Sequence, residues 1–161
     1  MSDKDLNSLF STLESQVNQL NSAAESANTE LERAQQRLAS LNIAIEIWHT
    51  RPLERSDVTG GIQLNEISTE IISLLGYAKV DSKWCLAIKK VRCESGFYEG
   101  DMNCPFTNKY LESPPTPLLS QSRSLRLNAL ATIPTFLEEI AEHVNNLLEE
   151  LPKSKAKLHA V

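Results

Sequence analysis

The chain has 161 residues, of which 41% are hydrophobic and 23% are charged, and its formal net charge at pH 7 is −5. These fractions are ordinary for a folded soluble protein, but five glycines and 6% aromatic residues argue against a β-sandwich, a β-barrel or a glycine-rich nucleotide fold. The excess of acidic residues excludes nucleic-acid binding that is driven by bulk charge alone.

The first fifty residues contain the strongest pattern in the chain. Apolar residues recur there at alternating spacings of four and three, and no proline or glycine occurs between Asp3 and Thr50. Such a repeat is typical of a coiled coil, and Pro52 is placed where a helix must stop. We therefore predict one coiled-coil helix over residues 1–50. Its predicted oligomer interface consists of Leu6, Phe10, Leu13, Val17, Leu20, Leu31, Leu38, Leu41 and Ile45.

This predicted helix could pair in two ways. At 1.5 Å per residue it would be about 70 Å long, which exceeds the diameter of a domain formed by the remaining residues, so self-association is the favoured interpretation. Folding of the helix back onto its own domain is the alternative. The positions that flank the apolar stripe are mostly uncharged, so the sequence leaves the orientation and the number of associated helices open.

The middle of the chain, residues 51–152, predicts a small α+β domain. Its first part, residues 51–61, is a polar connector. Apolar residues at helical spacing between Leu64 and Leu75 then predict a short helix, and Gly76 stands where a glycine commonly ends one.

A hairpin and a loop are predicted next. Tyr77–Val80 and Trp84–Glu94 are two β-capable runs on either side of a short polar turn, which predicts a hairpin. Residues 95–121 contain two glycines and several prolines, so we predict a long irregular loop there. The prolines of this segment are Pro105, Pro114, Pro115 and Pro117.

The last third of the chain is predicted to be helical, which makes the protein α+β and mostly helical around a small hairpin or sheet. Apolar residues recur at helical spacing from Leu125 to Leu151. Pro134 should kink or divide this helix and Pro152 should end it, because proline lacks an amide hydrogen and clashes one turn back. Residues 153–161 predict a basic, disordered tail.

The sequence has no recognisable catalytic or metal-binding motif. It contains no phosphate-binding loop, no nucleophile elbow, and no zinc or calcium pattern. Its three cysteines, Cys85, Cys93 and Cys104, lack a CxxC pair, which predicts reduced thiols and a cytoplasmic location. Neither a signal peptide nor a membrane-spanning run is recognisable. We therefore expect a protein that is not an enzyme, with no catalytic residues, no metal and no cofactor.

One segment is basic within this acidic chain. Between Tyr77 and Arg92 there are five lysines or arginines and one aspartate. The segment could bind an anion or an acidic partner, or its lysines could keep an edge strand soluble. The candidate binding residues are Lys83, Trp84, Lys89, Arg92, Arg123 and Arg126.

Together these patterns predict a non-enzymatic oligomerising adaptor that binds copies of itself through the N-terminal helix and also binds another protein. The alternative is a module that holds a nucleotide or a nucleic-acid backbone on the basic hairpin. No membrane partner is expected.

Overall fold

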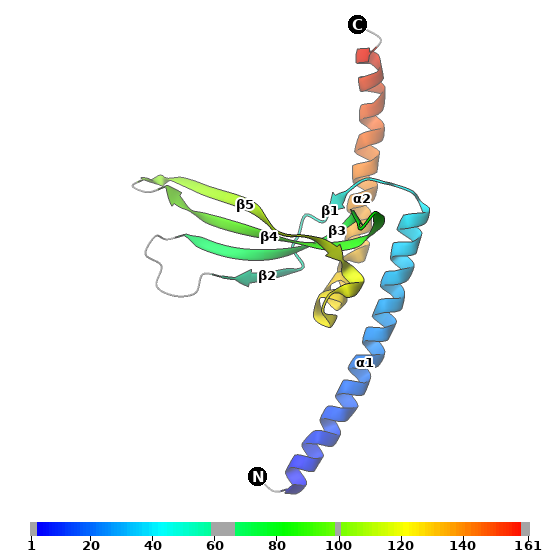
Figure 1. Cartoon of the computed structure of the whole chain (residues 1–161), viewed down its shortest axis with the longest axis vertical. Coiled ribbons are helices and arrows are strands. Elements are labelled where there is room, and N and C mark those ends of the chain that lie inside the picture. Colours follow the sequence, from blue (N-terminus) through cyan, green and yellow to red (C-terminus); the bar gives the residue numbers. More distant parts are fainter. Residues whose placement is uncertain (1–2, 59–66, 99–100, 159–161) are drawn as a thin grey trace.

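The computed structural model describes residues 3–58, 67–98 and 101–158. They form two long helices and a curled antiparallel sheet, which confirms the predicted α+β class (Figure 1). In chain order the elements are α1 (Asp3–Ser40), β1 (Ile47–Trp48), β2 (Glu54–Asp57), β3 (Ser68–Val80), β4 (Lys83–Tyr98), β5 (Asp101–Pro117), a 3₁₀ turn (Leu118–Ser120) and α2 (Arg123–Leu158).

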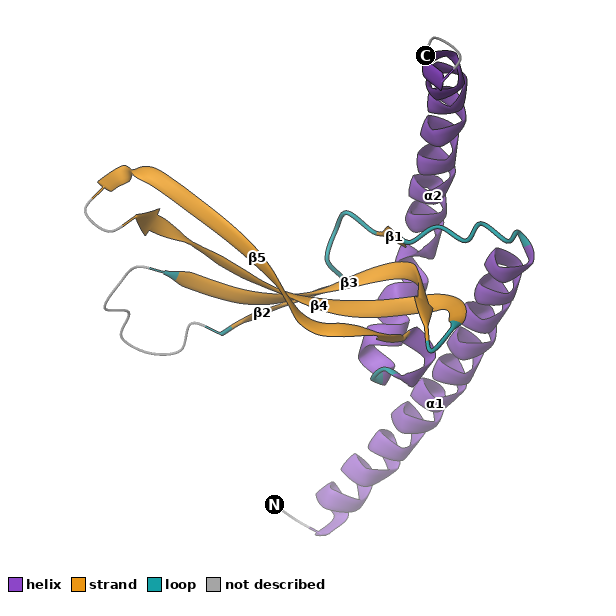
Figure 2. Cartoon of the chain, turned by 45° about the horizontal axis from the view of Figure 1, so that its top comes forward, coloured by secondary structure: helices purple, strands orange, loops and turns teal. Residues whose placement is uncertain are grey.

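The core lies between the two helices and one end of the sheet, and the rest of the sheet projects sideways away from both helices (Figures 1 and 2). Strand residues alternate between two faces, and the face that carries Leu75, Tyr77, Leu86 and Ile88 packs against the helices. The buried helix residues of this core are Leu31 and Leu38 from α1, and Leu125, Ala129, Ile133, Phe136 and Ile140 from α2.

Helix α1 ends at Ser40, ten residues before the predicted end at residue 50, which is therefore wrong. Asn42 and Ala44 have φ angles of 49° and 50°, in the left-handed region that ends helices. The chain then turns back so that Ile47 and Trp48 pair with β3. The sequence has no glycine or proline at this point that would end a helix locally. The helix ends here because the following residues pair with β3.

The predicted hairpin turn is present, but its strands are much longer than predicted. Asp81 and Ser82 connect β3 to β4 with φ angles of 47° and 69°, as the tightest two-residue hairpin turns require. The two strands stay in register over thirteen residue pairs, from Val80 opposite Lys83 to Ser68 opposite Ser95.

The short helix predicted from Leu64 to Leu75 is wrong where the structure describes it, because residues from Ser68 onward belong to β3; residues 59–66 lie outside the described residues. Apolar residues in this run fit either a helix or a strand that is covered on both faces. Gly76 does not end a helix but lies within the strand. A Cβ atom there would overlap the indole ring of Trp48, so the strand needs glycine at this position.

The predicted loop over residues 95–121 is wrong as well where the structure describes it, since residues 95–98 complete β4 and residues 101–120 form β5 and the 3₁₀ turn; residues 99–100 lie outside the described residues. In the described sheet, β5 is an edge strand that pairs with β4. An edge strand tolerates proline because half of its amide groups need no partner strand. The four prolines therefore mark an edge and not a loop.

Helix α2 runs without a break from Arg123 to Leu158, through both Pro134 and Pro152. The predicted stop at Pro152 is wrong, and so is the disordered tail for residues 153–158. A proline inside a helix costs about 3 kcal/mol. Around Pro134 this cost is offset because Ile133 and Phe136 on either side of it are buried in the core.

Candidate interaction surface

The apolar stripe of α1 is buried along one half of the helix and exposed along the other. Ala24, Ala27, Leu31 and Leu38 are at most 7% exposed. Towards the N-terminus the same heptad positions are between 37% and 60% exposed. These positions, which we call the α1 seam, are Leu6, Phe10, Leu13, Val17 and Leu20.

The difference arises because the core reaches only the C-terminal half of α1. There the helix packs beside α2, and a groove of about 410 Å³ between them is lined by Ala34, Leu38 and Leu41 on one side and Leu130, Ile133 and Leu137 on the other. In addition, the side chain of Gln35 accepts a hydrogen bond of 3.0 Å from the backbone N–H of Leu86 in β4. The N-terminal half of α1 extends beyond this contact into solvent (Figure 1).

Helix α2 shows the opposite arrangement, because its C-terminal half extends beyond the core at the other end of the molecule (Figures 1 and 2). Leu147, Leu148 and Leu151 are 36%, 59% and 52% exposed. Two shallow apolar grooves of about 480 and 440 Å³ run along this helix, and Val144 and Leu148 line both. We call Val144, Leu148 and Leu151 the α2 seam.

Four residues of the predicted interface lie elsewhere than expected. Leu31 and Leu38 are 0% and 3% exposed in the chain's own core, so they are not available to a partner. Leu41 follows the end of α1 and is 68% exposed, and Ile45 packs against the core from the connection to β1. Leu9, 59% exposed, lies beside the α1 seam and was missed because it is off the heptad pattern.

The predicted basic residues on the hairpin do not form one cluster. Successive residues of a strand point to opposite faces, so Lys83 and Lys89 of β4 share one face, whereas Trp84 and Arg92 lie on the other. Trp84 stacks on Tyr77 with ring centroids 5.6 Å apart. It therefore contributes to the core instead of a binding surface.

Lys89 and Arg92 already have partners within the chain. Lys89 Nζ lies 4.2 Å from the ring centroid of Trp48, and burial lowers the pKa of Lys89, opposed by the nearby Glu46. Arg92 donates two hydrogen bonds of 2.8 and 3.0 Å to Glu112. These bonds raise the pKa of Arg92 and lower the pKa of Glu112.

The two arginines at the start of α2 differ. Arg123 is exposed at the first residue of the helix. Arg126 donates a hydrogen bond of 3.3 Å from Nη1 to the backbone carbonyl of Leu119, and its Nε is buried without a partner among the described residues. Both lie on a different element from the hairpin lysines.

A polar cluster that the sequence did not indicate joins β1 to α2. His49 Nδ1 lies 2.8 Å from one carboxylate oxygen of Glu139, and the hydroxyl of Thr50 donates to the other at 2.6 Å. Burial raises the pKa of Glu139, but the hydrogen bonds from Thr50 and His49 outweigh it, so the pKa is lowered. His49 is 3% exposed and its ring meets the edge of Phe136. The cluster joins the chain after α1 to α2.

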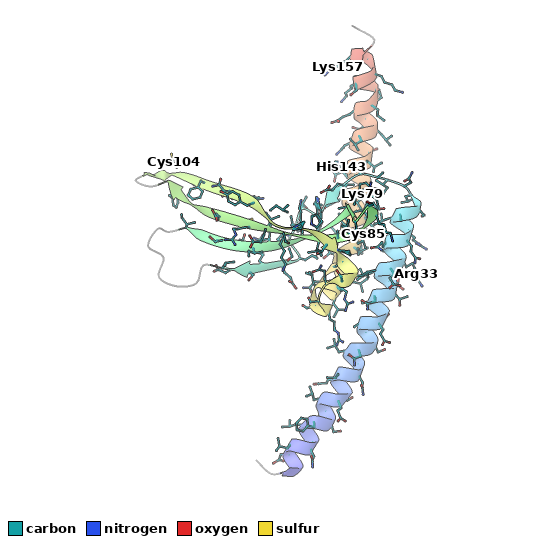
Figure 3. The ribbon with its side chains drawn as sticks, in the orientation of Figure 1. Arg33, Lys79, Cys85, Cys104, His143 and Lys157 are labelled. Carbon is teal, nitrogen blue, oxygen red and sulfur yellow. The ribbon has the colours of Figure 1, made fainter. Side chains whose placement is uncertain are left out.

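The cysteines show no sign of shared chemistry. Cys85 lies near the helices and Cys104 near the outer end of the sheet (Figure 3). Burial and the nearby Asp81 raise the pKa of Cys85, which makes its thiol less reactive. Within the described residues, no three histidine, cysteine, aspartate or glutamate side chains come together as a metal site. In the same residues, neither helix is both long enough and apolar enough to cross a membrane.

A scan against protein-family models finds no match to this chain, and no curated protein or solved structure matches it. The evidence for a function of this protein is therefore its own surface.

Proposed function

We propose that this protein is a non-enzymatic interaction protein that assembles with copies of itself through the α1 seam. One observation carries the proposal: five large apolar side chains at consecutive heptad positions are left 37–60% exposed on one helix face. Contiguous exposed apolar patches of this kind mark interaction sites in soluble proteins, and a heptad stripe is buried most completely by another helix.

The shape of the molecule supports a role as an adaptor. The outer parts of β4 and β5 project away from the helices (Figure 1), and Phe97, Tyr110 and Leu111 on them are 43%, 50% and 61% exposed. Assembly through the helices would leave this outer sheet free to bind another protein.

The experiment compares the mass of the full chain with that of Leu13→Asp by light scattering at tens of micromolar. The wild-type chain should exceed its monomer mass of 18.0 kDa. Leu13→Asp should return to that mass, because a charge at the centre of the seam opposes desolvation. Leu111→Ser is the matched control, since it removes an equally exposed leucine from the sheet and should leave the mass unchanged. A wild-type chain that is monomeric under these conditions would refute the proposal.

A further inference from the structure

The two seams lie at opposite ends of the molecule. The α1 seam spans the fifteen residues Leu6–Leu20, about 22 Å of helix, and the α2 seam spans the eight residues Val144–Leu151, about 12 Å. Each seam is also the continuation of a face that is covered within the chain. The α1 seam continues the stripe that Leu31 and Leu38 bury, and the α2 seam continues the row of Leu130 and Leu137 that faces α1.

The two helices pack side by side in the same direction. Ala34 faces Leu130 and Ile133, and further along Leu41 faces Leu137 and Ala141, so residue numbers rise together on both helices. Helix α2 begins too late to lie beside the α1 seam, and α1 ends too early to lie beside the α2 seam. Each seam therefore has no helix of its own chain next to it.

From this stagger we infer that the α1 seam of one copy docks on the α2 seam of the next copy, parallel and head to tail, so that the contact between α1 and α2 within each chain is continued between chains. The inference rests on the proposed self-association and names its docking site. In this arrangement Phe10 lies opposite Leu148 and Leu13 opposite Leu151. The next α1 would begin beside the connection from α1 to β1, in which Ile43 and Ile45 line the same grooves as Val144 and Leu148.

Charge is compatible with this docking. Glu14 is the one charged residue between Leu6 and Leu20. With Phe10 opposite Leu148, it falls within one turn of Lys153 and Lys155 and also of Glu149 and Glu150, and the last turn of α2 is basic, with Lys157 near its end (Figure 3). Opposite charges at the edge of a helix pair favour that pairing over alternatives.

A closed two-fold dimer that pairs the α1 seam of each copy with the α2 seam of the other is disfavoured by the same geometry. In such a dimer the partner's α2 would run antiparallel along α1 from the seam. Because α2 is 36 residues long, it would reach the stretch from Ala24 to Leu38 that the chain's own α2 and sheet already cover. A head-to-tail contact uses a different patch on each copy and leaves one patch free at each end, which generates open chains.

The experiment uses two full-length variants, Phe10→Glu and Leu148→Lys, alone and mixed in equal amounts, with mass followed by sedimentation over a range of concentrations. Each variant alone should be monomeric, because each has lost one of its two docking patches. The mixture should form at least a dimer of about 36 kDa, twice the chain mass of 18.0 kDa, since the intact α1 of Leu148→Lys can dock on the intact α2 of Phe10→Glu and the two new side chains have opposite charges. The wild-type mass should keep rising with concentration.

The controls place the same new charges on the opposite face of each helix, Ser15→Glu and Asn146→Lys, and should assemble like the wild type. If Leu148→Lys assembles normally while Phe10→Glu does not, the proposed self-association stands but the α1 seam pairs with something other than α2, and the inference fails. If the wild-type mass stops rising at about 36 kDa, the head-to-tail arrangement is overturned in favour of a closed dimer. If the wild type is monomeric, both proposals fall.

Discussion

The two halves of α1 carry the same repeat and meet different surroundings. From Ala24 to Leu38 the stripe is buried by the sheet and α2, whereas from Leu6 to Leu20 it lies in solvent. The sequence pattern is equally regular in both halves, so heptad spacing alone does not reveal whether a stripe is covered by its own chain or by another. What separates the halves is how far the core extends along the helix.

The largest effect is expected in the covered half. Leu31→Asp places a charge at a position that is 0% exposed, and an unpaired buried charge should destabilise the fold by more than about 4 kcal/mol. Thermal unfolding followed by circular dichroism would show this as a large fall in Tm or as a chain that does not fold. A Tm close to the wild-type value would mean that Leu31 is not in a closed core.

A smaller effect is expected where the chain leaves α1 and is anchored to α2. Glu139→Gln weakens the hydrogen bonds from His49 and Thr50, and hydrogen bonds to a charged group contribute about 1.5–3 kcal/mol. The pKa of Glu139 is lowered in the folded chain. Its contribution is therefore complete above the ordinary pKa of the carboxyl and is lost as pH falls through the lowered value.

Denaturant unfolding between pH 7 and pH 3 tests this prediction. The stability difference between the wild type and Glu139→Gln should shrink as the pH falls. The neighbouring, exposed Glu138→Gln is the control and should show no such trend. A difference that stays constant with pH would indicate that the ionised carboxylate is not what anchors the connection.

The next effect is smaller again and concerns the basic hairpin. Lys89→Ala removes a cation that lies 4.2 Å from the ring centroid of Trp48, and such a contact at a partly exposed site is worth about 0.5–1 kcal/mol. If Lys89 instead serves to bind a nucleotide or a nucleic-acid backbone, the variant would keep its stability and lose salt-sensitive binding to a short oligonucleotide. Unfolding curves and a binding titration at low salt separate the two roles.

The smallest effect on stability is expected in the uncovered half. Leu13→Asp should change the stability of the monomer by no more than about 0.5 kcal/mol, although it should abolish assembly. Leu31→Asp makes the same substitution in the same helix. The two variants together therefore test directly whether the two halves of α1 differ in burial. Equal losses of stability in the two variants would show that the halves do not differ in the way their exposure indicates.

The parts of the fold that could be predicted from sequence are those with a local cause. The turn at Asp81 and Ser82 was recognisable because three polar residues, Asp81 to Lys83, separate two β-capable runs, and α1 was recognisable from its repeat. The part of β3 before Tyr77 was not, because the apolar run around Ile71 and Leu75 suits a helix and a doubly covered strand equally well. Pairing with β4 along its length decided the outcome.

The remaining errors also come from contacts between distant residues. The prolines of β5 indicate a loop until it is known that the strand lies at an edge of the sheet. Pro134 indicates a kink or a division of the helix, and the division does not occur because Ile133 and Phe136 are held in the core. At the interaction surface, the residues of the α1 seam were predicted, but the α2 seam was not, since its leucines matched an ordinary amphipathic helix. The pair formed by His49 and Glu139 lies ninety residues apart in sequence and left no pattern to recognise.

We propose that the helices bring many copies of this protein together. The prolines of β5 have a second consequence in such an assembly. Assembly raises the local concentration of the projecting sheets, and an open strand edge at high concentration is a template for amyloid-like growth. Along β5, each of Pro105, Pro114, Pro115 and Pro117 whose nitrogen faces the open edge withholds an amide hydrogen that an incoming strand would need. At the other side of the sheet, β2 is four residues long and carries three charges. The protein therefore keeps its sheets from fusing while its helices remain free to associate.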